Sequence, residues 1–117
     1  VILVTDAMAA AGMPDGDDYE LGGLPVVMKC GVARLKESGN LAGSTLTMIS
    51  AFRHMVRAVG VSVSDASKMA SGNPARQIGI DRETGSLQAG KRADVLLLDA
   101  DLELKQVWIG GKRHAEE

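Results

Sequence analysis

Hydrophobic and polar positions along the chain form runs that predict a mixed order of strands and helices. The chain opens with four apolar residues, Val1 to Val4, which lead into Thr5 and Asp6. A continuous apolar run of this kind is typical of a strand covered on both faces, as in a parallel sheet. We expect the strand at Ile2–Thr5, with Asp6 at its carboxyl end. In α/β folds and barrels, catalytic and ligand-binding groups lie at the carboxyl ends of the strands. Asp6 is therefore a candidate functional residue. The alternative interpretation is that Asp6 only caps a turn after the strand.

The next segment passes from turn-forming residues to short β-prone runs. Residues 12–18 combine two glycines, a proline and three aspartates, which predicts a solvated surface loop. A calcium-binding loop is the weaker alternative, because the bidentate glutamate that such loops need is missing. From Tyr19 to Leu35, β-prone runs alternate with glycine turns and predict a meander of small strands. Cys30 lies at one of these corners and is expected to be a buried or half-buried packing residue.

Apolar residues recur at helical spacing from Leu46 onward and predict a helix over Thr45–Val59. Ser44 is the expected N-cap, and Gly60 is the expected end of the helix. The N-terminus of such a helix, together with a glycine at position 43, can bind an anion and let a ligand approach the backbone. An ordinary capped helix after a tight glycine turn accounts for the same pattern.

Two short helices are predicted between Asp65 and Gly79. Ser64 is expected to cap the first of them, which Gly72 ends. Asn73 is expected to cap the second, in which a proline occupies the first position, where its missing N–H costs nothing. This stretch is therefore predicted as helix, sharp corner and helix.

The last third of the chain has a β pattern. Val95–Asp99 is an apolar strand, and Gln106–Ile109 is a second strand that leads into a Gly110-Gly111 hairpin turn. His114 is expected in a frayed polar tail, and His54 is expected to be a surface or half-buried residue of the long helix. We assign neither histidine to a metal site.

Composition and charge narrow the class of protein. The 117 residues are 45% hydrophobic with a net charge of −2, which gives no reason to expect nucleic acid or an anionic membrane as a partner. No apolar run approaches the roughly 18 residues that span a bilayer. A single cysteine cannot form an internal disulfide and fits a reducing cytosol, so we expect a cytoplasmic protein. Because the chain begins inside a predicted strand, we expect a piece of a larger protein.

Two sets of motifs stand out along the chain. The first set comprises Asn73-Pro74-Ala75-Arg76 and the spaced residues Gly85, Leu87, Gly90, Lys91, Ala93, Asp94, Val95, Leu98 and Asp99. This set resembles the C-terminal end of the amidohydrolase superfamily. The second set comprises Thr5-Asp6-Ala7-Met8, Tyr19-x-Leu21-Gly22-Gly23, Ala33-Arg34-Leu35 and Leu41-Ala42-Gly43-Ser44-Thr45-Leu46-Thr47-Met48. The second set is more specific and resembles the N-acetylglucosamine-6-phosphate deacetylases within that superfamily.

The resemblance implies an α/β fold class, namely the C-terminal fragment of a (β/α)8 barrel with part of a small β-sandwich domain. Residues 1–80 would form the end of the barrel, with the meander at about 19–35 as an insertion. Residues 81–117 would supply strands of the sandwich. The complete enzyme would be a homo-oligomer, such as a dimer, in which the remainder of the enzyme chain covers this part.

The resemblance also implies a reaction and its residues. The reaction is the metal-dependent hydrolysis of the N-acetyl group of an amino-sugar phosphate. Asp6 would accept a proton from the metal-bound water and later donate one to the departing amine. Leu41, Ala42 and Gly43 would line the amino-sugar pocket.

The metal ligands that the resemblance implies are a glutamate and two histidines from earlier barrel strands. Neither His54 nor His114 matches a ligand position. The divalent metal, zinc or a similar ion, would therefore have its ligands outside this chain, and we expect the fragment to be inactive alone. Another amidohydrolase, related to dihydroorotase or adenine deaminase, and a non-catalytic binding or scaffold module are the alternatives.

Overall fold

The computed structural model describes residues 1–114, except for the side chain of Asp17. The chain divides into two compact units, one formed by Val4–Ala51 and the other by Val1–Leu3 together with the chain from Phe52 onward. In the described part, each unit contains one three-stranded sheet, and both sheets are antiparallel. The mixed α/β class expected from the sequence is confirmed at this level.

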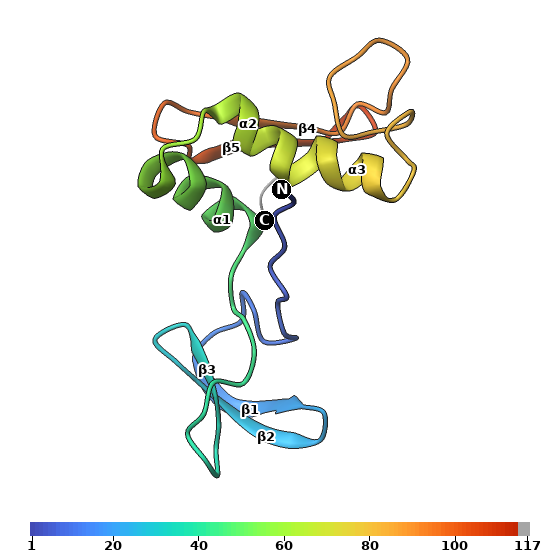
Figure 1. The fold of residues 1–117 in the computed structure, drawn as a ribbon. Helices are drawn as coiled ribbons and strands as arrows, with labels where there is room; N and C mark the ends of the chain where they lie inside the picture. The colour runs from blue at the N-terminus through green and yellow to red at the C-terminus, as the bar shows by residue number, and fades with distance from the viewer. Residues whose placement is uncertain (115–117) are drawn as a thin grey trace. The chain divides into compact units, whose positions relative to one another are not determined.

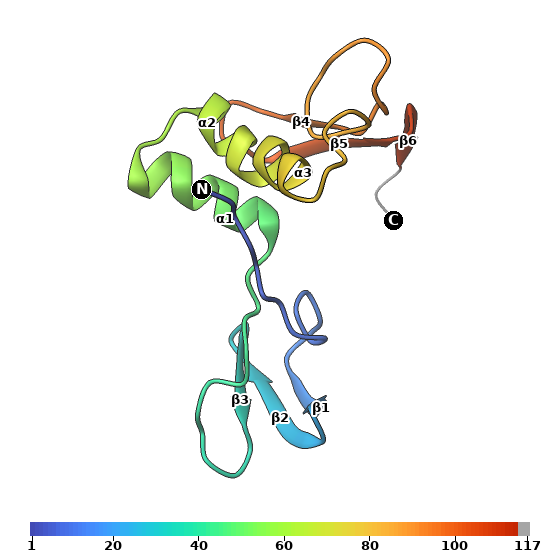
Figure 2. The same cartoon turned by 45° about the vertical axis from the view of Figure 1, so that its right-hand side comes forward.

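The sheet of the Val4–Ala51 unit is the predicted meander. Its strands are β1 (Gly16–Leu21), β2 (Leu24–Lys29) and β3 (Val32–Leu35), in the order β1-β2-β3 (Figures 1 and 2). β1 begins inside the segment predicted as a loop, so that part of the prediction is wrong. The aspartate-rich segment joins the sheet because Gly16 finds a ladder partner in Met28, with an irregular register before Tyr19.

The turn between β2 and β3 is held by a carboxylate from outside the hairpin. Cys30 and Gly31 have φ values of +51° and +70°, the left-handed pair that tight hairpins favour. The Asp15 carboxylate accepts hydrogen bonds from the backbone N–H of Cys30 at 2.6 Å and of Gly31 at 3.2 Å. Cys30 is exposed, and the expected burial is wrong because the residue lies at the tip of the turn.

The core of this unit is small and joins three segments of the chain. Tyr19 and Leu35 pack against it from the edges. Met8 enters it from the segment that precedes β1, and Ala42 enters it from the segment that follows β3. These two residues are therefore packed together, although the whole meander separates them in sequence. The buried members of the core are Met8, Ala10, Val26, Met28, Ala33 and Ala42.

The strand predicted at Ile2–Thr5 is absent. The backbone there forms no ladder with any other described strand, and the N–H of Leu3 donates to the carbonyl of Met69 at 3.0 Å instead. A strand requires a partner edge for its N–H and C=O groups, and a continuous apolar run does not supply one. Pairing is limited to an isolated parallel bridge between Ala7 and Ser44.

The long predicted helix begins later than expected. It consists of α1 (Met48–His54) followed by a π-helical turn, η1 (Met55–Val59). The expected cap at Ser44 is wrong, because the Oγ1 of Thr47 accepts the N–H of Ser50 at 3.3 Å and occupies that role. Gly60 ends the helix in a left-handed conformation with φ of +83°, as predicted.

The two short helices form one continuous helical stretch. It runs through α2 (Val63–Ser67), the π-helical turn η2 (Lys68–Gly72) and α3 (Asn73–Gln77). The predicted corner is wrong, because Gly72 and Asn73 both have right-handed helical dihedrals. The wider turn of η2 precedes Pro74, which has no N–H to donate within a regular helix.

The cap of α2 was also predicted at the wrong serine. The Oγ of Ser62, and not that of Ser64, accepts the N–H of Asp65 at 3.0 Å. The same hydroxyl donates to the Asp65 carboxylate at 2.8 Å. Within the part of the chain that the structure describes, no helix has the length and apolarity needed to cross a membrane.

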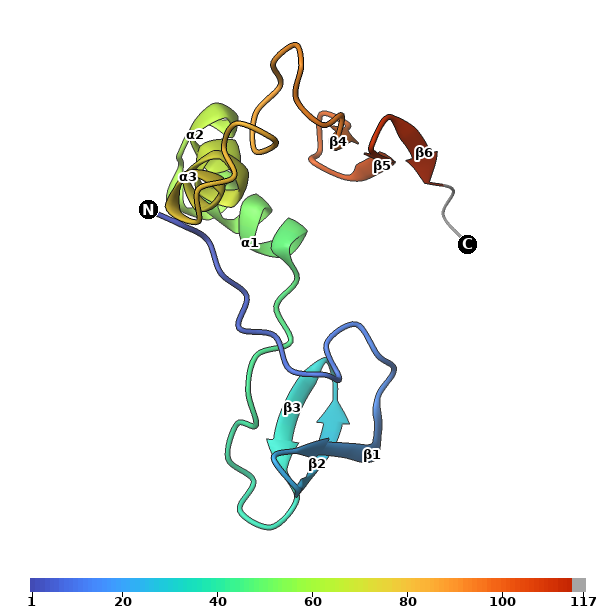
Figure 3. The same ribbon diagram turned by 90° about the vertical axis from the view of Figure 1, so that its right-hand side faces the viewer.

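The second sheet carries the predicted C-terminal strands. It contains β4 (Val95–Leu98), β5 (Leu104–Ile109) and β6 (Lys112–His114), in the order β4-β5-β6. The helices of this unit lie along one face of the sheet (Figures 1 and 3), where Phe52, Ala66 and Leu102 form a small core. His114 belongs to β6, so its assignment to a polar tail is wrong.

Aspartate side chains hold the turns of this sheet. Asp94 accepts the N–H of Gly110 at 2.9 Å in the β5–β6 turn and pairs with Arg92. The Gly110 hydrogen bond, followed by the one from Arg92, lowers the pKa of Asp94 below its ordinary value of 3.8. The pKa of Asp99 is lowered in the same direction, first by Lys105 and then by the backbone N–H of Glu103.

These lowered pKa values predict a loss of stability in acid. A carboxylate with a lowered folded-state pKa binds fewer protons when folded than when unfolded. Its contribution is therefore complete above the ordinary value of 3.8 and is lost as the pH falls through the folded pKa. Asp94→Asn keeps an acceptor for Gly110 but cannot titrate. We expect the variant to be less stable near neutral pH and to lose less melting temperature on acidification.

Thermal melting of the parent and Asp94→Asn proteins, from about pH 6 down to about pH 3, measures this difference. Asp99 is left unchanged in both proteins and should account for part of the dependence of melting temperature on pH that remains in the variant. Parallel curves of melting temperature against pH would contradict the role assigned to Asp94.

Candidate functional site

Asp6 lies at an exposed left-handed corner of the backbone. Its φ is +48°, and its side chain is open to solvent. Aspartate is among the few residues other than glycine that visit this region, because its short polar side chain can hydrogen-bond locally. Strained residues of this kind concentrate at functional sites. The left-handed corner at Asp6 is compatible with both the catalytic role and the turn cap considered from the sequence.

The Leu41–Gly43 segment is attached to β3. The N–H of Ala42 donates to the carbonyl of Ala33 at 2.9 Å, and Leu41 forms an isolated antiparallel bridge with Arg34. Ala42 is buried in the core, while Leu41 is 66% exposed. Gly43 then turns left-handed, with φ of +100°. Leu41 and Ala42 are thus both tied to β3, and the buried Ala42 lies between two exposed residues.

The structure brings Asp6 and Gly43 together. Ala7 and Ser44 form a parallel bridge, and the N–H of Met8 donates to the carbonyl of Ser44 at 2.9 Å. Asp6 and Gly43 each immediately precede a partner in that bridge, so they are neighbours across it. This juxtaposition unites the residues that sequence reasoning had proposed from two separate motifs.

The anion site considered at the start of the long helix assumed that Gly43 borders the helix, and this assumption is wrong. Gly43 does not border the helix, because α1 begins at Met48 and Thr47 caps it. The residues in between form a separate hydrogen-bonded connection. The hydroxyl of Thr45 donates to the carbonyl of Gly31 at 2.6 Å, and the hydroxyl oxygen of Ser44 accepts the N–H of Leu46 at 3.1 Å.

The described residues do not fit a metal ion. Among residues 1–114, no group of three or more His, Cys, Asp or Glu side chains is gathered as a ligand set. His54 closes α1 and His114 lies in β6, and both are exposed. A metal-dependent reaction would therefore need ligands beyond these residues.

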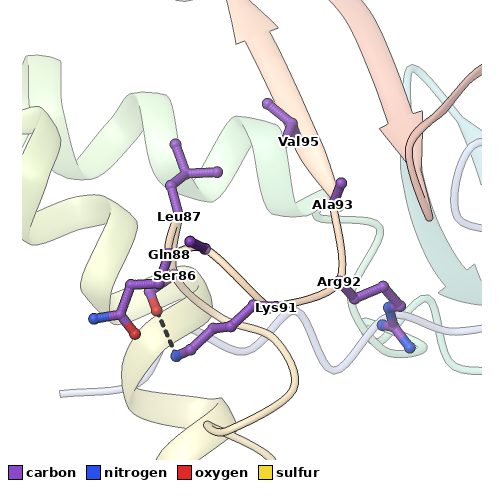
Figure 4. Close-up of a pocket in the computed structure, with 8 residues that line it drawn as sticks. Ser86, Leu87, Gln88, Lys91, Arg92, Ala93 and Val95 are labelled. Atoms are coloured by element: carbon purple, nitrogen blue, oxygen red, sulfur yellow. Dashed lines mark hydrogen bonds between the residues drawn. The ribbon is translucent and has the colours of Figure 1, made fainter.

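A surface hollow of about 270 Å³ lies in the other unit, between α3 and β4 in the chain (Figure 4). Lys91 lies across one side of it and donates to the hydroxyl of Ser86 at 2.7 Å and to the carbonyl of Asp81. Figure 4 shows Lys91 directed toward Ser86 and Arg92 on the other side. This lysine holds the turn together, and none of the predicted site residues lines the hollow.

Sequence reasoning missed the part that Met8 plays at the site. Met8 is 8% exposed and contacts the region of Gly43, where an added Cβ would lie 3.3 Å from the Cβ of Met8. One signal was present in the sequence. Met8 is the only large apolar residue among the small residues between Asp6 and Gly12. Its partners lie far away in sequence, so no local pattern could identify them.

Comparison with known proteins gives a consistent result. The model of the amidohydrolase family matches residues 1–114. N-acetylgalactosamine-6-phosphate deacetylase from Escherichia coli O157:H7 is 52% identical over 112 residues, covering 96% of this chain and 29% of that protein. N-acetylglucosamine-6-phosphate deacetylase from Vibrio furnissii is 43% identical over 110 residues, covering 94% of this chain and 27% of that protein.

A solved structure agrees with these relatives. It is N-acetyl-D-glucosamine-6-phosphate deacetylase from Mycobacterium smegmatis, determined for a variant in complex with N-acetyl-D-glucosamine-6-phosphate. The TM-score is 0.83 at 41% identity, covering 96% of this chain and 30% of that one. The chain thus spans under a third of the length of these three proteins. Because the family model matches almost every residue, the chain belongs to the amidohydrolase family.

Proposed function

We propose that this chain is part of a deacetylase that removes the acetyl group from an N-acetylated amino-sugar 6-phosphate. The observation that carries the proposal is identity of 43–52% to two such deacetylases over nearly the whole chain. The relationship also weakens the alternatives related to dihydroorotase or adenine deaminase, because both compared sequences are named as deacetylases. It equally disfavours a scaffold without catalysis.

The reaction requires a proton acceptor that later becomes a donor. Water adds to the acetyl carbonyl and gives up a proton, and the amine nitrogen takes a proton as the C–N bond breaks, which yields acetate and the free amino sugar. We assign both transfers to the Asp6 carboxylate. Its exposure and its left-handed backbone support this role, since both present the side chain outward from the bridge at Ala7.

The Leu41–Gly43 segment is the proposed sugar-contacting surface. Gly43 adjoins Asp6 across the bridge and has no side chain between its backbone and a ligand. Leu41 is exposed beside it and offers an apolar contact. Ala42 is buried, so its contribution to the pocket would come through the backbone.

The proposal extends to the domains of the complete enzyme. We place residues 1–80 at the end of a (β/α)8 barrel and residues 81–117 in a small β-sandwich domain of a cytoplasmic enzyme. The rest of that enzyme would hold the divalent metal ion, zinc or similar, and would assemble as a dimer. In the proposed barrel strand, neighbouring strands would cover the side chains of Val1 and Val4, which are 83% and 72% exposed here.

Two epimeric amino-sugar phosphates are candidate substrates. The sequence motifs favour N-acetylglucosamine 6-phosphate as the substrate. The 52% identity to a deacetylase named for the galactose epimer favours N-acetylgalactosamine 6-phosphate. Both share the amide and the phosphate, so the reaction assigned to Asp6 is the same.

Acetate release by the complete enzyme tests the proposed function. We expect release from one or both 6-phosphates, with a difference in kcat/KM that identifies the preferred epimer. The unphosphorylated N-acetyl sugars serve as matched controls for the phosphate. An enzyme loaded with divalent metal that releases acetate from neither phosphate would overturn the proposal.

Asp6→Asn tests the proton-transfer role. Asparagine has the same shape and also tolerates the left-handed conformation, so the fold and substrate binding should persist. The amide cannot accept the proton, and we expect kcat to fall by about 10²–10⁴-fold. Steady-state kinetics together with the melting temperature measure this. Turnover within a few-fold of the parent would reduce Asp6 to a turn residue.

Gly43→Val tests the sugar-contacting surface. A valine side chain at this position would meet Met8 and displace the backbone of the proposed sugar-contacting surface, so we expect a raised KM with metal content unchanged. The positive φ adds strain of about 1–2 kcal/mol. Gly60→Val is the matched control, because Gly60 has φ of +83° with no neighbour within 4 Å of an added Cβ. Equal effects of the two variants on KM would remove Gly43 from the pocket.

A further inference from the structure

We propose that Met8 is a positioning residue that fixes Asp6 against the Leu41–Gly43 segment. The inference rests on the proposed function, because it concerns how the groups of that site are held. Met8 itself touches neither reacting atoms nor substrate in this proposal. It acts through the backbone that follows Asp6 and through the packing of its side chain.

The backbone of Met8 is tied in two directions. Its N–H donates to the carbonyl of Ser44 at 2.9 Å, and its carbonyl accepts the N–H of Ala11 at 2.9 Å. The first bond joins the chain after Asp6 to the residue after Gly43. The second closes the turn that follows. Met8 is therefore fixed on both sides, only two residues from the proposed proton-transfer group.

The side chain of Met8 packs where Gly43 has none. A Cβ on Gly43 would lie 3.3 Å from Cβ, 3.7 Å from Cγ and 3.9 Å from Sδ of Met8. Met8 and Ala42 also belong to the same buried core. The thioether chain is unbranched and adaptable, so it suits the irregular space beside a left-handed glycine.

The other side of the segment has an independent anchor. Ala42 is bonded to Ala33 in β3, and Leu41 bridges to Arg34 in the same strand. The Leu41–Gly43 segment is thus held between β3 and Met8. Met8→Ala keeps the backbone hydrogen bond to Ser44 and the Cβ but removes the Cγ and Sδ beside Gly43. The segment then loses side-chain packing on one side while β3 still holds the other, so it should shift without loss of the sheet.

Asp6 depends on the same support. Its left-handed conformation is a strained one that persists only when the surrounding structure enforces it. Enforcement comes from the parallel bridge between Ala7 and Ser44, of which the Met8–Ser44 hydrogen bond is part. A loosened Met8 therefore affects the carboxylate and the sugar-contacting surface at once, which predicts changes in both kcat and KM.

The test compares Met8→Ala with Met28→Ala in the complete enzyme. Met28 is 3% exposed and belongs to the same core, but it lies in β2. Both variants should lower the melting temperature by similar amounts. We expect Met8→Ala to lose about tenfold or more in kcat/KM per folded molecule, as small misplacements of catalytic groups do. Met28→Ala should stay within about twofold of the parent.

Two further variants test whether side-chain volume restores activity and provide a substitute if Met8→Ala does not fold. Met8→Leu keeps the volume and should restore most of the activity. Met8→Val shortens the side chain less severely and replaces Met8→Ala if that variant does not fold. Activity that falls only in proportion to the unfolded fraction, or equal losses for the Met8 and Met28 variants, would overturn the inference.

Amide hydrogen exchange separates this inference from the proposed function. In Met8→Ala, the N–H groups of Met8 and Ala42 should exchange faster relative to those of β2, whereas Met28→Ala should not show this pattern. The measurement needs no substrate. A parent enzyme without deacetylase activity would refute the proposed function, and unchanged exchange at these two amides would refute the positioning role of Met8.

Discussion

The hydrogen bond from the N–H of Met8 to the carbonyl of Ser44 is the contact on which the Val4–Ala51 unit depends. It closes a loop that contains the whole β1–β2–β3 meander. Closing such a loop costs conformational entropy, and the cost grows slowly with loop length. The small core offsets it, because Met8 and Ala42 are buried together with residues of β2 and β3. The meander therefore serves as the frame that holds the segments of Asp6 and Gly43 side by side.

Carboxylates perform the same task at the tight turns of both units. Asp15 accepts the N–H groups of the β2–β3 turn, and Asp94 accepts the N–H of Gly110 in the β5–β6 turn. Each aspartate comes from outside the hairpin that it holds. In the Val4–Ala51 unit, the turn held by Asp15 is also connected to the candidate site. The hydroxyl of Thr45, the residue after Ser44, donates to the carbonyl of Gly31 in that turn. The turn thus provides a second connection to the segment that contains Gly43.

Local patterns predicted the elements whose partners lie nearby in sequence. The meander, the C-terminal strands and the end of the helix at Gly60 depend on alternation, hairpin turns and one left-handed glycine. The strand at Ile2–Thr5 failed because an apolar run does not reveal whether a partner edge exists. The observed helix caps are Thr47 and Ser62, and not the predicted Ser44 and Ser64, because several hydroxyl residues lie near each helix start and any of them can cap it. Motif resemblance singled out Asp6 and Leu41–Gly43, but their contact through Met8 is non-local and required the structure.

The left-handed residues at the site explain why the pairing there is so short. Asp6 and Gly43 have φ values of +48° and +100°, and a backbone in this region cannot continue a β ladder. Pairing is therefore confined to the single bridge between Ala7 and Ser44. A longer ladder would commit the backbone groups of both segments to each other. In the proposed enzyme, the pairing ends where the surface for the amino sugar begins, and the packing of Met8 beside Gly43 supplies support that further strand pairing would otherwise provide.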